Sequence, residues 1–222
     1  MTIRAVVIGA GHYLPKRVVE NAEFEGKIDT DDEWIRSRSG IERRHFVSDG
    51  ETTSTMATAA ALAALKDAGK TAADVDAIIL ATSTADLTFP SAATMVQAQL
   101  GMERGFAFDI QAVCAGFIFA LANANALIAS GQVKRVLVIG AETFSKIIDW
   151  TDRTTSVLFG DGAGALLLEA QEGEGTSKDR GILSTDLNSD GRLHDLLFAD
   201  GGVSTGTTGY VRMQGNQVFR HA

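Results

Sequence analysis

Cys114 is the residue of this sequence best suited to covalent chemistry. It is the only cysteine among 222 residues, so it can form neither an internal disulfide nor a cysteine-based metal cluster. It lies between a strand-like run, Phe106 to Ile110, and a helix-like run, Ala115 to Ser130. Backbone N–H groups at a helix start stabilise a thiolate by roughly 0.3 to 2 kcal/mol. The position indicates a nucleophilic thiol, although the packing of a small apolar side chain explains a lone cysteine about equally well.

A histidine is the usual base for such a thiol, and the chain contains four. His12 follows a glycine turn, and His45 lies in a predicted charged loop. His194 lies in another predicted loop, and His221 lies in the last predicted helix. None of these segments is predicted to return to the end of the strand before Cys114, so the sequence assigns no catalytic histidine.

Other motifs suggest nucleotide binding without establishing it. Gly9-Ala10-Gly11 follows a strand, but Leu14 stands where a dinucleotide fingerprint needs its third glycine. Residues 160–164 are glycine-rich but lie between strands and are followed by no Lys-Ser/Thr pair, which excludes a phosphate loop. Trp34 and Arg38 are one helical turn apart and could hold an adenine, although surface packing explains this pair as well.

The elements that position these residues alternate between strands and helices. Strands are predicted at 3–8, 77–82, 106–110, 135–140 and 165–169, and helices at 53–68, 91–100 and 115–130. This order predicts an α/β fold with a mixed sheet, right-handed crossovers and helices on both faces. Residues 15–49 are polar and their pattern is interrupted, which indicates an inserted surface element. A capping box at Thr30 is predicted to start a short helix in this element.

A charged connection near residue 170 divides the chain into two predicted domains. Residues 1–170 form one complete half, and residues 171–222 form a connection and the start of a second half. In the second part we predict strands at 182–188 and 210–213, a loop at 201–209, and a helix opening at Asn216.

The helix at 115–130 has no charged residue on any face. A helix that is apolar all round must be covered all round, whereas a single sheet covers one side. We therefore expect another layer, supplied by further sequence, by a partner chain, or by both.

Composition excludes several classes of protein. A formal charge of -8 and a pI near 5.0 leave no broad basic surface for nucleic acid or for an anionic membrane. No apolar run reaches the roughly 18 residues of a membrane span, and the run at 5–10 is too short for a secretory signal. We predict a cytoplasmic protein.

Several motifs together closely resemble β-ketoacyl-acyl carrier protein synthase III. The resemblance extends from the first strand to the last residue, in the family's order. It is carried by the segments at 29–41, 89–93, 109–117, 151–153, 159–165 and 213–219. It implies the thiolase fold, in which two similar α/β halves form a five-layered αβαβα core, usually in a homodimer. The chain would supply one complete half and the start of the other.

The resemblance also implies a reaction and a set of site residues. Cys114 would take an acyl group, typically acetyl, from an acyl-CoA, and the carbanion formed by decarboxylation of malonyl-acyl carrier protein would attack the resulting thioester. Coenzyme A is then a substrate, and no cofactor or metal is implied. The residues implied for coenzyme A binding are Thr30, Trp34, Arg38, Arg153 and Phe219, and Phe89 is implied to line the acyl pocket of the partner subunit.

The family's decarboxylating histidine and asparagine match positions beyond Ala222. A polypeptide of residues 1–222 alone is therefore expected not to complete the condensation. A decarboxylation assay checks this expectation, and turnover at the rate of a full-length relative would contradict it.

Two alternatives stay open. Related enzymes of the same fold build polyketides, quinolones or other ketones from coenzyme A thioesters. A non-catalytic thioester-binding scaffold would keep Cys114 for packing alone.

Overall fold

The computed structural model describes residues 1–221, and Ala222 lies outside the described residues. Contacts divide the chain into two compact units. The first unit contains residues 1–14, 50–142 and 162–187, and the second contains 15–49, 143–161 and the residues from 188 onward. The units are interleaved in sequence, and the domain boundary expected near residue 170 stays a prediction.

The first unit contains a five-stranded mixed sheet. Its spatial order is β1 (Thr2–Tyr13), β7 (Asp161–Gly173), β6 (Arg135–Thr143), β4 (Ala77–Ala81) and β5 (Phe106–Ile110). β1 pairs antiparallel with β7, whereas β4 lies parallel to both β5 and β6. The predicted mixed sheet is confirmed, and β5 has the predicted bounds.

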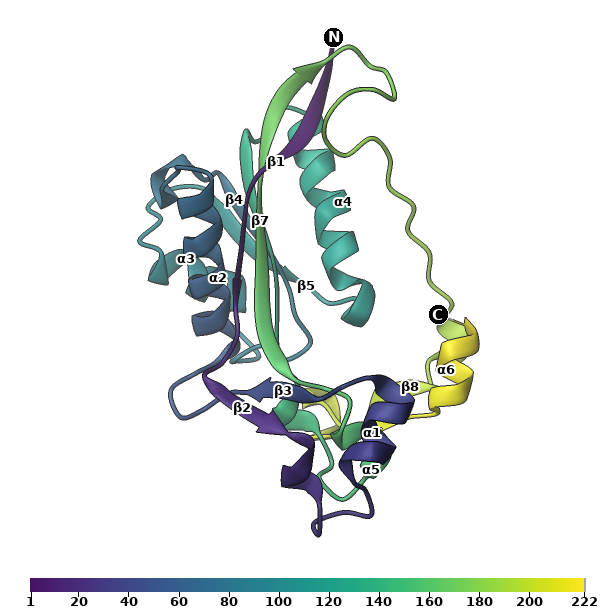
Figure 1. Cartoon of the computed structure of the whole chain (residues 1–222). Helices are drawn as coiled ribbons and strands as arrows, with labels where there is room; N and C mark the ends of the chain where they lie inside the picture. The colour runs from purple at the N-terminus through teal and green to yellow at the C-terminus, as the bar shows by residue number, and fades with distance from the viewer. Residues whose placement is uncertain (222) are drawn as a thin grey trace. The chain divides into compact units, whose positions relative to one another are not determined.

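Helices cover both faces of this sheet, as predicted (Figure 1). α2 (Thr53–Asp67) and α3 (Ala92–Gln99) lie on one face, and α4 (Gly116–Ala129) lies on the other. Alternate residues of β4 serve the two faces, because Ala77, Ile79 and Ala81 pack in the same buried cluster as α4. Because β4 and β5 are parallel, their carboxyl ends lie at the same edge of the sheet, next to the start of α4.

β1 continues beyond the predicted strand because its glycines let a helix approach closely. A Cβ atom on Gly9 would lie 2.4 Å from the carbonyl oxygen of Ala64, and one on Gly11 would lie 2.3 Å from the backbone nitrogen of Ala64. Both contacts are far shorter than van der Waals distances. The glycines of the Gly9-Ala10-Gly11 segment therefore serve the packing of β1 on α2, which agrees with the rejection of a dinucleotide fingerprint.

α4 is covered on one side by the first unit. Its buried residues recur at every fourth position, at Gly116, Ala120, Ala124 and Ile128. Outside this stripe Ile118 is 50% exposed. Within residues 1–221 the helix thus keeps an uncovered apolar side, and the additional layer expected from the sequence stays a prediction.

The second unit is built from short elements around its own core. Its strands are β2 (Arg17–Glu20), β3 (Arg43–Phe46), β8 (Leu197–Ala199) and β9 (Val211–Met213), and its α-helices are α1 (Asp32–Ser39), α5 (Arg153–Ser156) and α6 (Gly215–His221). Phe24, Ile35 and Phe46 are buried together in this unit. Residues 15–49 are thus inserted between two segments of the first unit, as predicted, but they are more than surface structure because these apolar side chains form a core.

Smaller differences from the predicted elements concern turns and ends. Asp31 caps α1 instead of Thr30, since its side chain accepts a hydrogen bond from the Trp34 backbone N–H at 2.6 Å. No strand forms at 182–188, whereas β9 and α6 lie close to their predicted positions. The short 3-10 helices are η1 (Asn21–Phe24), η2 (Ala72–Asp74), η3 (Val113–Ala115), η4 (Phe144–Ile147), η5 (Gly191–Leu193) and η6 (Val203–Thr205). Among the described residues, no helix is both long and apolar enough to cross a membrane.

Candidate active site

Cys114 lies in η3, between the end of β5 and the start of α4. Its side chain is exposed. The expected strand-to-helix position is confirmed, but the thiol is not buried at the start of a covered helix. Within residues 1–221 the side chain therefore does not fill a core, and both the nucleophile and the packing interpretation stay open. Its role as a nucleophile stays a prediction.

The backbone before Cys114 adopts an unusual conformation. Val113 has a φ of 47°, which is in the left-handed region that β-branched residues avoid. Such a conformation costs on the order of 1 to 3 kcal/mol and persists where the surroundings impose it, often at functional sites. Here buried Gly116 lets the start of α4 approach the end of β4, since a Cβ on Gly116 would lie 3.2 Å from the Ala81 Cβ. The tight entry into α4 thus fixes the segment that presents Cys114.

No histidine forms a hydrogen bond with the Cys114 thiol within the described residues. His45 lies in β3 instead of a loop, with Nδ1 2.6 Å from the Pro15 carbonyl oxygen. His194 has Nδ1 3.1 Å from the Gly191 carbonyl oxygen. His12 lies on β1 opposite Gly164, and His221 ends the described part of α6.

Carboxylates that the sequence analysis missed hold the loop between β4 and α3. Glu142 accepts hydrogen bonds from the Ser83 backbone N–H, at 2.7 Å, and from the Thr84 hydroxyl. At the other end of the loop, Asp109 accepts from the backbone N–H groups of Ala92 and Ala93, at 2.8 and 2.7 Å. Burial raises the pKa of Glu142 against the opposing effect of its hydrogen bonds. The loop is therefore fixed at both ends by neighbouring strands.

The loop between β4 and α3 is also held in its middle. Asp86 accepts hydrogen bonds from the Ser54 backbone N–H and hydroxyl, each at 2.9 Å. Phe89, predicted to line an acyl pocket, lies in this loop and is 82% exposed. Within residues 1–221, a loop held at several points therefore presents a large apolar side chain to the outside.

In the second unit, the structure brings together three of the residues predicted to bind coenzyme A. The guanidinium carbons of Arg38 and Arg153 lie 4.5 and 4.9 Å from the centre of the Trp34 ring. Arg153 Nη1 also donates to the Asp29 carbonyl oxygen and to its Oδ2, both at 2.7 Å. A half-buried indole with two guanidinium groups is suited to binding a base and its phosphates.

The other two predicted coenzyme A residues are placed differently. Thr30 adjoins this cluster, and its hydroxyl oxygen is buried without a hydrogen-bond partner among the described residues. Phe219 lies on α6 and is 89% exposed, and no ring contact with Trp34 occurs in the described part of the chain. Thr30 is thus joined to the cluster only through its sequence neighbour Asp29, Phe219 is not joined to it, and the roles of both stay predictions.

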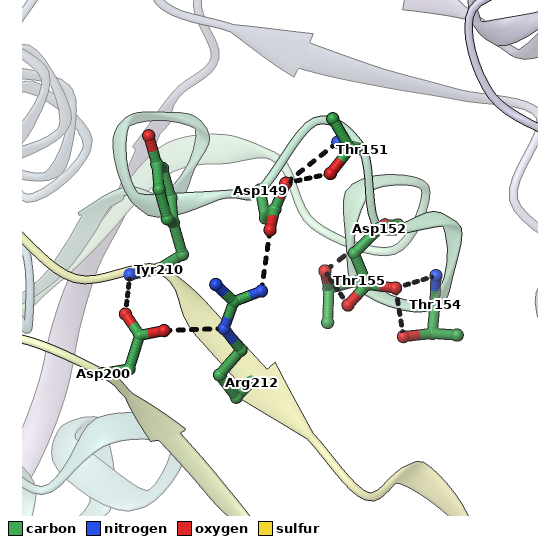
Figure 2. Close-up of polar contacts among 8 residues, drawn as sticks. All are labelled: Asp149, Thr151, Asp152, Thr154, Thr155, Asp200, Tyr210 and Arg212. Carbon is green, nitrogen blue, oxygen red and sulfur yellow. Dashed lines mark hydrogen bonds and ion pairs between the residues drawn. The ribbon is translucent and has the colours of Figure 1, made fainter.

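Hydrogen-bonded side chains hold the turn from Asp149 to Asp152 (Figure 2). Arg153 follows this turn directly in the sequence. Asp149 Oδ1 accepts from the Thr151 backbone N–H at 3.0 Å and from its hydroxyl at 2.6 Å. Asp152 Oδ1 accepts from the Thr154 backbone N–H at 2.8 Å, which caps α5. The sequence carried a signal for Asp152, because an Asp before a short helix is a common cap. It carried no signal for Asp149, whose further partner, Arg212, is distant in the chain.

The Asp149 carboxyl is expected to titrate far below an ordinary aspartate. Hydrogen bonds from Thr151 and Arg212 lower its pKa from 3.8 to about 2. Because the folded-state pKa is depressed, this contact stabilises the fold fully above pH 3.8 and loses its contribution as the pH falls toward 2. An NMR titration of the carboxyl carbon checks the value, and a midpoint near 3.8 would contradict it.

Comparisons with known proteins identify relatives of the chain. A family profile described as 3-oxoacyl-[acyl-carrier-protein (ACP)] synthase III matches residues 108–191, which include Cys114 and Arg153. A beta-ketoacyl-[acyl-carrier-protein] synthase III of Ruegeria sp. (strain TM1040) is 82% identical over 222 residues. That alignment covers all of this chain and 69% of the relative.

Solved structures are similar in fold. The 3-oxoacyl-[acyl-carrier-protein] synthase III from Aquifex aeolicus VF5 has a TM-score of 0.89 and 46% identity, covering 98% of this chain and 67% of that one. The corresponding enzyme from Pseudomonas aeruginosa PAO1 has a TM-score of 0.90 and 41% identity, covering 98% and 66%. These similarities confirm the predicted α/β, thiolase-like fold class.

Proposed function

Because the chain belongs to the beta-ketoacyl-[acyl-carrier-protein] synthase III family, we propose that its protein condenses an acyl-CoA with malonyl-acyl carrier protein. The product is a 3-oxoacyl-acyl carrier protein, which initiates fatty acid synthesis, and the acyl donor is acetyl-CoA. The observation that carries the proposal in this chain is the exposed thiol of Cys114 at the strand-to-helix turn.

The reaction proceeds through a covalent acyl-Cys114 intermediate. The thiolate attacks the thioester carbon of the acyl-CoA, a new carbon–sulfur bond forms, and the coenzyme A thiolate leaves and takes up a proton. Backbone N–H groups at the start of α4 stabilise the negative charge on the thioester oxygen. Malonyl-acyl carrier protein then loses CO₂, and its carbanion attacks the acyl carbon, which returns the thiolate of Cys114.

The cluster of Trp34, Arg38 and Arg153 binds coenzyme A. The flat indole stacks on the adenine, and the guanidinium groups pair with phosphate oxygens, which they contact through fixed donor geometry. Thr30 lies beside this cluster, and Phe219 contributes from α6. Coenzyme A is a substrate in this scheme, and no cofactor is required.

The protein acts in the cytoplasm as a homodimer. Phe89 contributes to the acyl pocket of the partner subunit, for which its 82% exposure in this chain is a precondition. The uncovered side of α4 is consistent with a further layer of the same assembly.

Mass spectrometry after incubation with acetyl-CoA tests the proposed intermediate. We expect an added acetyl group, and peptide fragmentation is expected to place it on Cys114. A folded, full-length sample that gains no acetyl group would favour the scaffold alternative and refute the proposal.

Loss of Arg153 is expected to weaken coenzyme A binding more than it slows acyl transfer. In Arg153→Ala, the half-saturating acetyl-CoA concentration should rise roughly tenfold or more, because a charge-assisted contact contributes about 1.5 to 3 kcal/mol. The maximal rate of Cys114 acylation should change little, since Arg153 does not touch the reacting atoms in this scheme. Arg17→Ala is the matched control, because Arg17 also pairs with a carboxylate, Glu23, and lies over an aromatic ring in the same unit. An equal effect in both variants would contradict the assignment.

A further inference from the structure

Arg212 joins two carboxylates within the second unit (Figure 2). Its Nη1 donates to Asp149 Oδ2 and its Nε donates to Asp200 Oδ2, both at 2.7 Å. Asp200 is itself held on the β8–β9 hairpin, because its Oδ1 accepts from the Tyr210 backbone N–H at 2.6 Å. The guanidinium therefore connects this hairpin to the turn that begins at Asp149, and it offsets the repulsion between two negative charges.

Hydrogen bonds within a short turn connect Asp149, the partner of Arg212, to the start of α5. The Asp152 backbone N–H donates to the Asp149 carbonyl oxygen at 3.0 Å. The Asp149 carboxylate accepts hydrogen bonds from the Thr151 backbone N–H and hydroxyl. The Asp152 carboxylate then caps α5, whose first residue is Arg153. Every residue from Asp149 to Thr154, except Trp150 and Arg153, thus takes part in hydrogen bonds that define the path of the backbone.

The side chain of Arg153 contacts the Asp29 carboxylate, the Asp29 carbonyl oxygen and the Trp34 ring. Its ion pair with Asp29 is at the surface, where the Asp29 side chain is 97% exposed. Exposed ion pairs of this kind typically contribute about 0 to 1 kcal/mol. The position of Arg153 over Trp34 therefore depends on its bond to the Asp29 carbonyl oxygen and on the backbone of the turn that carries it.

We infer that Arg212 is a positioning residue for the coenzyme A site, which fixes Arg153 over Trp34 by anchoring the turn at Asp149. Arg212 does not touch the substrate in this arrangement and acts through Arg153. The inference rests on the proposed function, because it assigns Arg212 a role in the binding of the acyl-CoA.

The test measures acylation of Cys114 by acetyl-CoA over a range of acetyl-CoA concentrations. In Arg212→Gln, the half-saturating concentration should rise about tenfold, and the maximal rate should stay within about twofold. Asp149→Asn, which preserves the size of the side chain, should also raise the half-saturating acetyl-CoA concentration. Arg192→Gln is the matched control, since Arg192 pairs with Asp190 at 2.8 and 2.6 Å elsewhere in this unit, and it should have no effect.

A spectroscopic measurement and a double variant distinguish positioning from general stability. In Arg212→Gln, the pKa of Asp149 measured by NMR should move up from about 2. Adding Arg212→Gln to Arg153→Ala should raise the half-saturating concentration no further, because Arg153 transmits the effect. The inference is overturned if the double variant shows a further increase in the half-saturating concentration as large as that of Arg212→Gln alone. It is also overturned if neither Arg212→Gln nor Asp149→Asn raises this concentration. If Arg153→Ala itself has no effect, the proposed coenzyme A site fails and the inference fails with it.

Discussion

Replacement of Cys114 by alanine is expected to abolish acyl transfer from acetyl-CoA. The proposed intermediate is a thioester on this sulfur, and the chain contains no other cysteine to replace it. Losing the nucleophile of a covalent mechanism lowers the rate on the order of 10⁴-fold or more. The measurement is the release of free coenzyme A, together with the mass of the protein after incubation.

The stability of the Cys114→Ala variant provides the control. Cys114 is exposed, so its replacement should change the free energy of unfolding by only about 0.5 kcal/mol or less. Cys114→Ser tests the chemistry with a side chain of similar shape, and it should also be severely impaired, because a hydroxyl is far less easily ionised than a thiol. Coenzyme A release at an undiminished rate from a folded Cys114→Ala protein would show that the acyl group is carried elsewhere.

A second large effect is expected on stability, from the close packing of β1 on α2. In Gly11→Ala, the new Cβ would lie 2.3 Å from the backbone nitrogen of Ala64 and 2.4 Å from the carbonyl oxygen of Ala60. These atoms belong to the helix backbone, so the helix as a whole must move to accommodate one methyl group. We expect a loss of about 3 kcal/mol or more in the free energy of unfolding, at the upper end for overpacked cores. Urea denaturation followed by circular dichroism measures it.

Gly164→Ala is the matched control for Gly11→Ala. Gly164 lies on the neighbouring strand β7, opposite His12, which follows Gly11 directly in the sequence. A Cβ atom there meets nothing within 4 Å, and this glycine has no positive φ. This variant should unfold at the same urea concentration as the parent or slightly higher, because alanine costs less conformational entropy in a strand than glycine. Equal losses in the two variants would show that the contact with Ala64 is not the cause.

The order of strands and helices in the first unit could be predicted because these elements carry a strong local signal. The run of Ala77 to Ala81 is apolar throughout, and Ser91 stands where a helix cap is needed. The strand at 3–8 was predicted too short, since glycine normally weakens a strand and only the approach of α2 explains Gly9 and Gly11. A contact between distant segments leaves no mark in the local pattern.

Prediction was less complete for the second unit and its site. Trp34 and Arg38 could be paired from their helical spacing, and Arg153 was added through the family resemblance. Arg212 could not be found in this way, because its partners Asp149 and Asp200 are 63 and 12 residues away in sequence. Short strands such as β3 were also misread, because Arg44 is charged and yet buried among hydrogen-bond acceptors.

The loop that carries Phe89 has a consequence for association. Its ends are bonded to Glu142 and Asp109, and its middle is bonded through Asp86, so it has already lost most of its conformational freedom on folding. A flexible loop would lose that backbone freedom when it docks, at about 1 to 2 kcal/mol for each residue that becomes fixed. For the loop that carries Phe89, most of this entropic penalty falls on folding, which leaves more of the free energy of aromatic burial available for recognition.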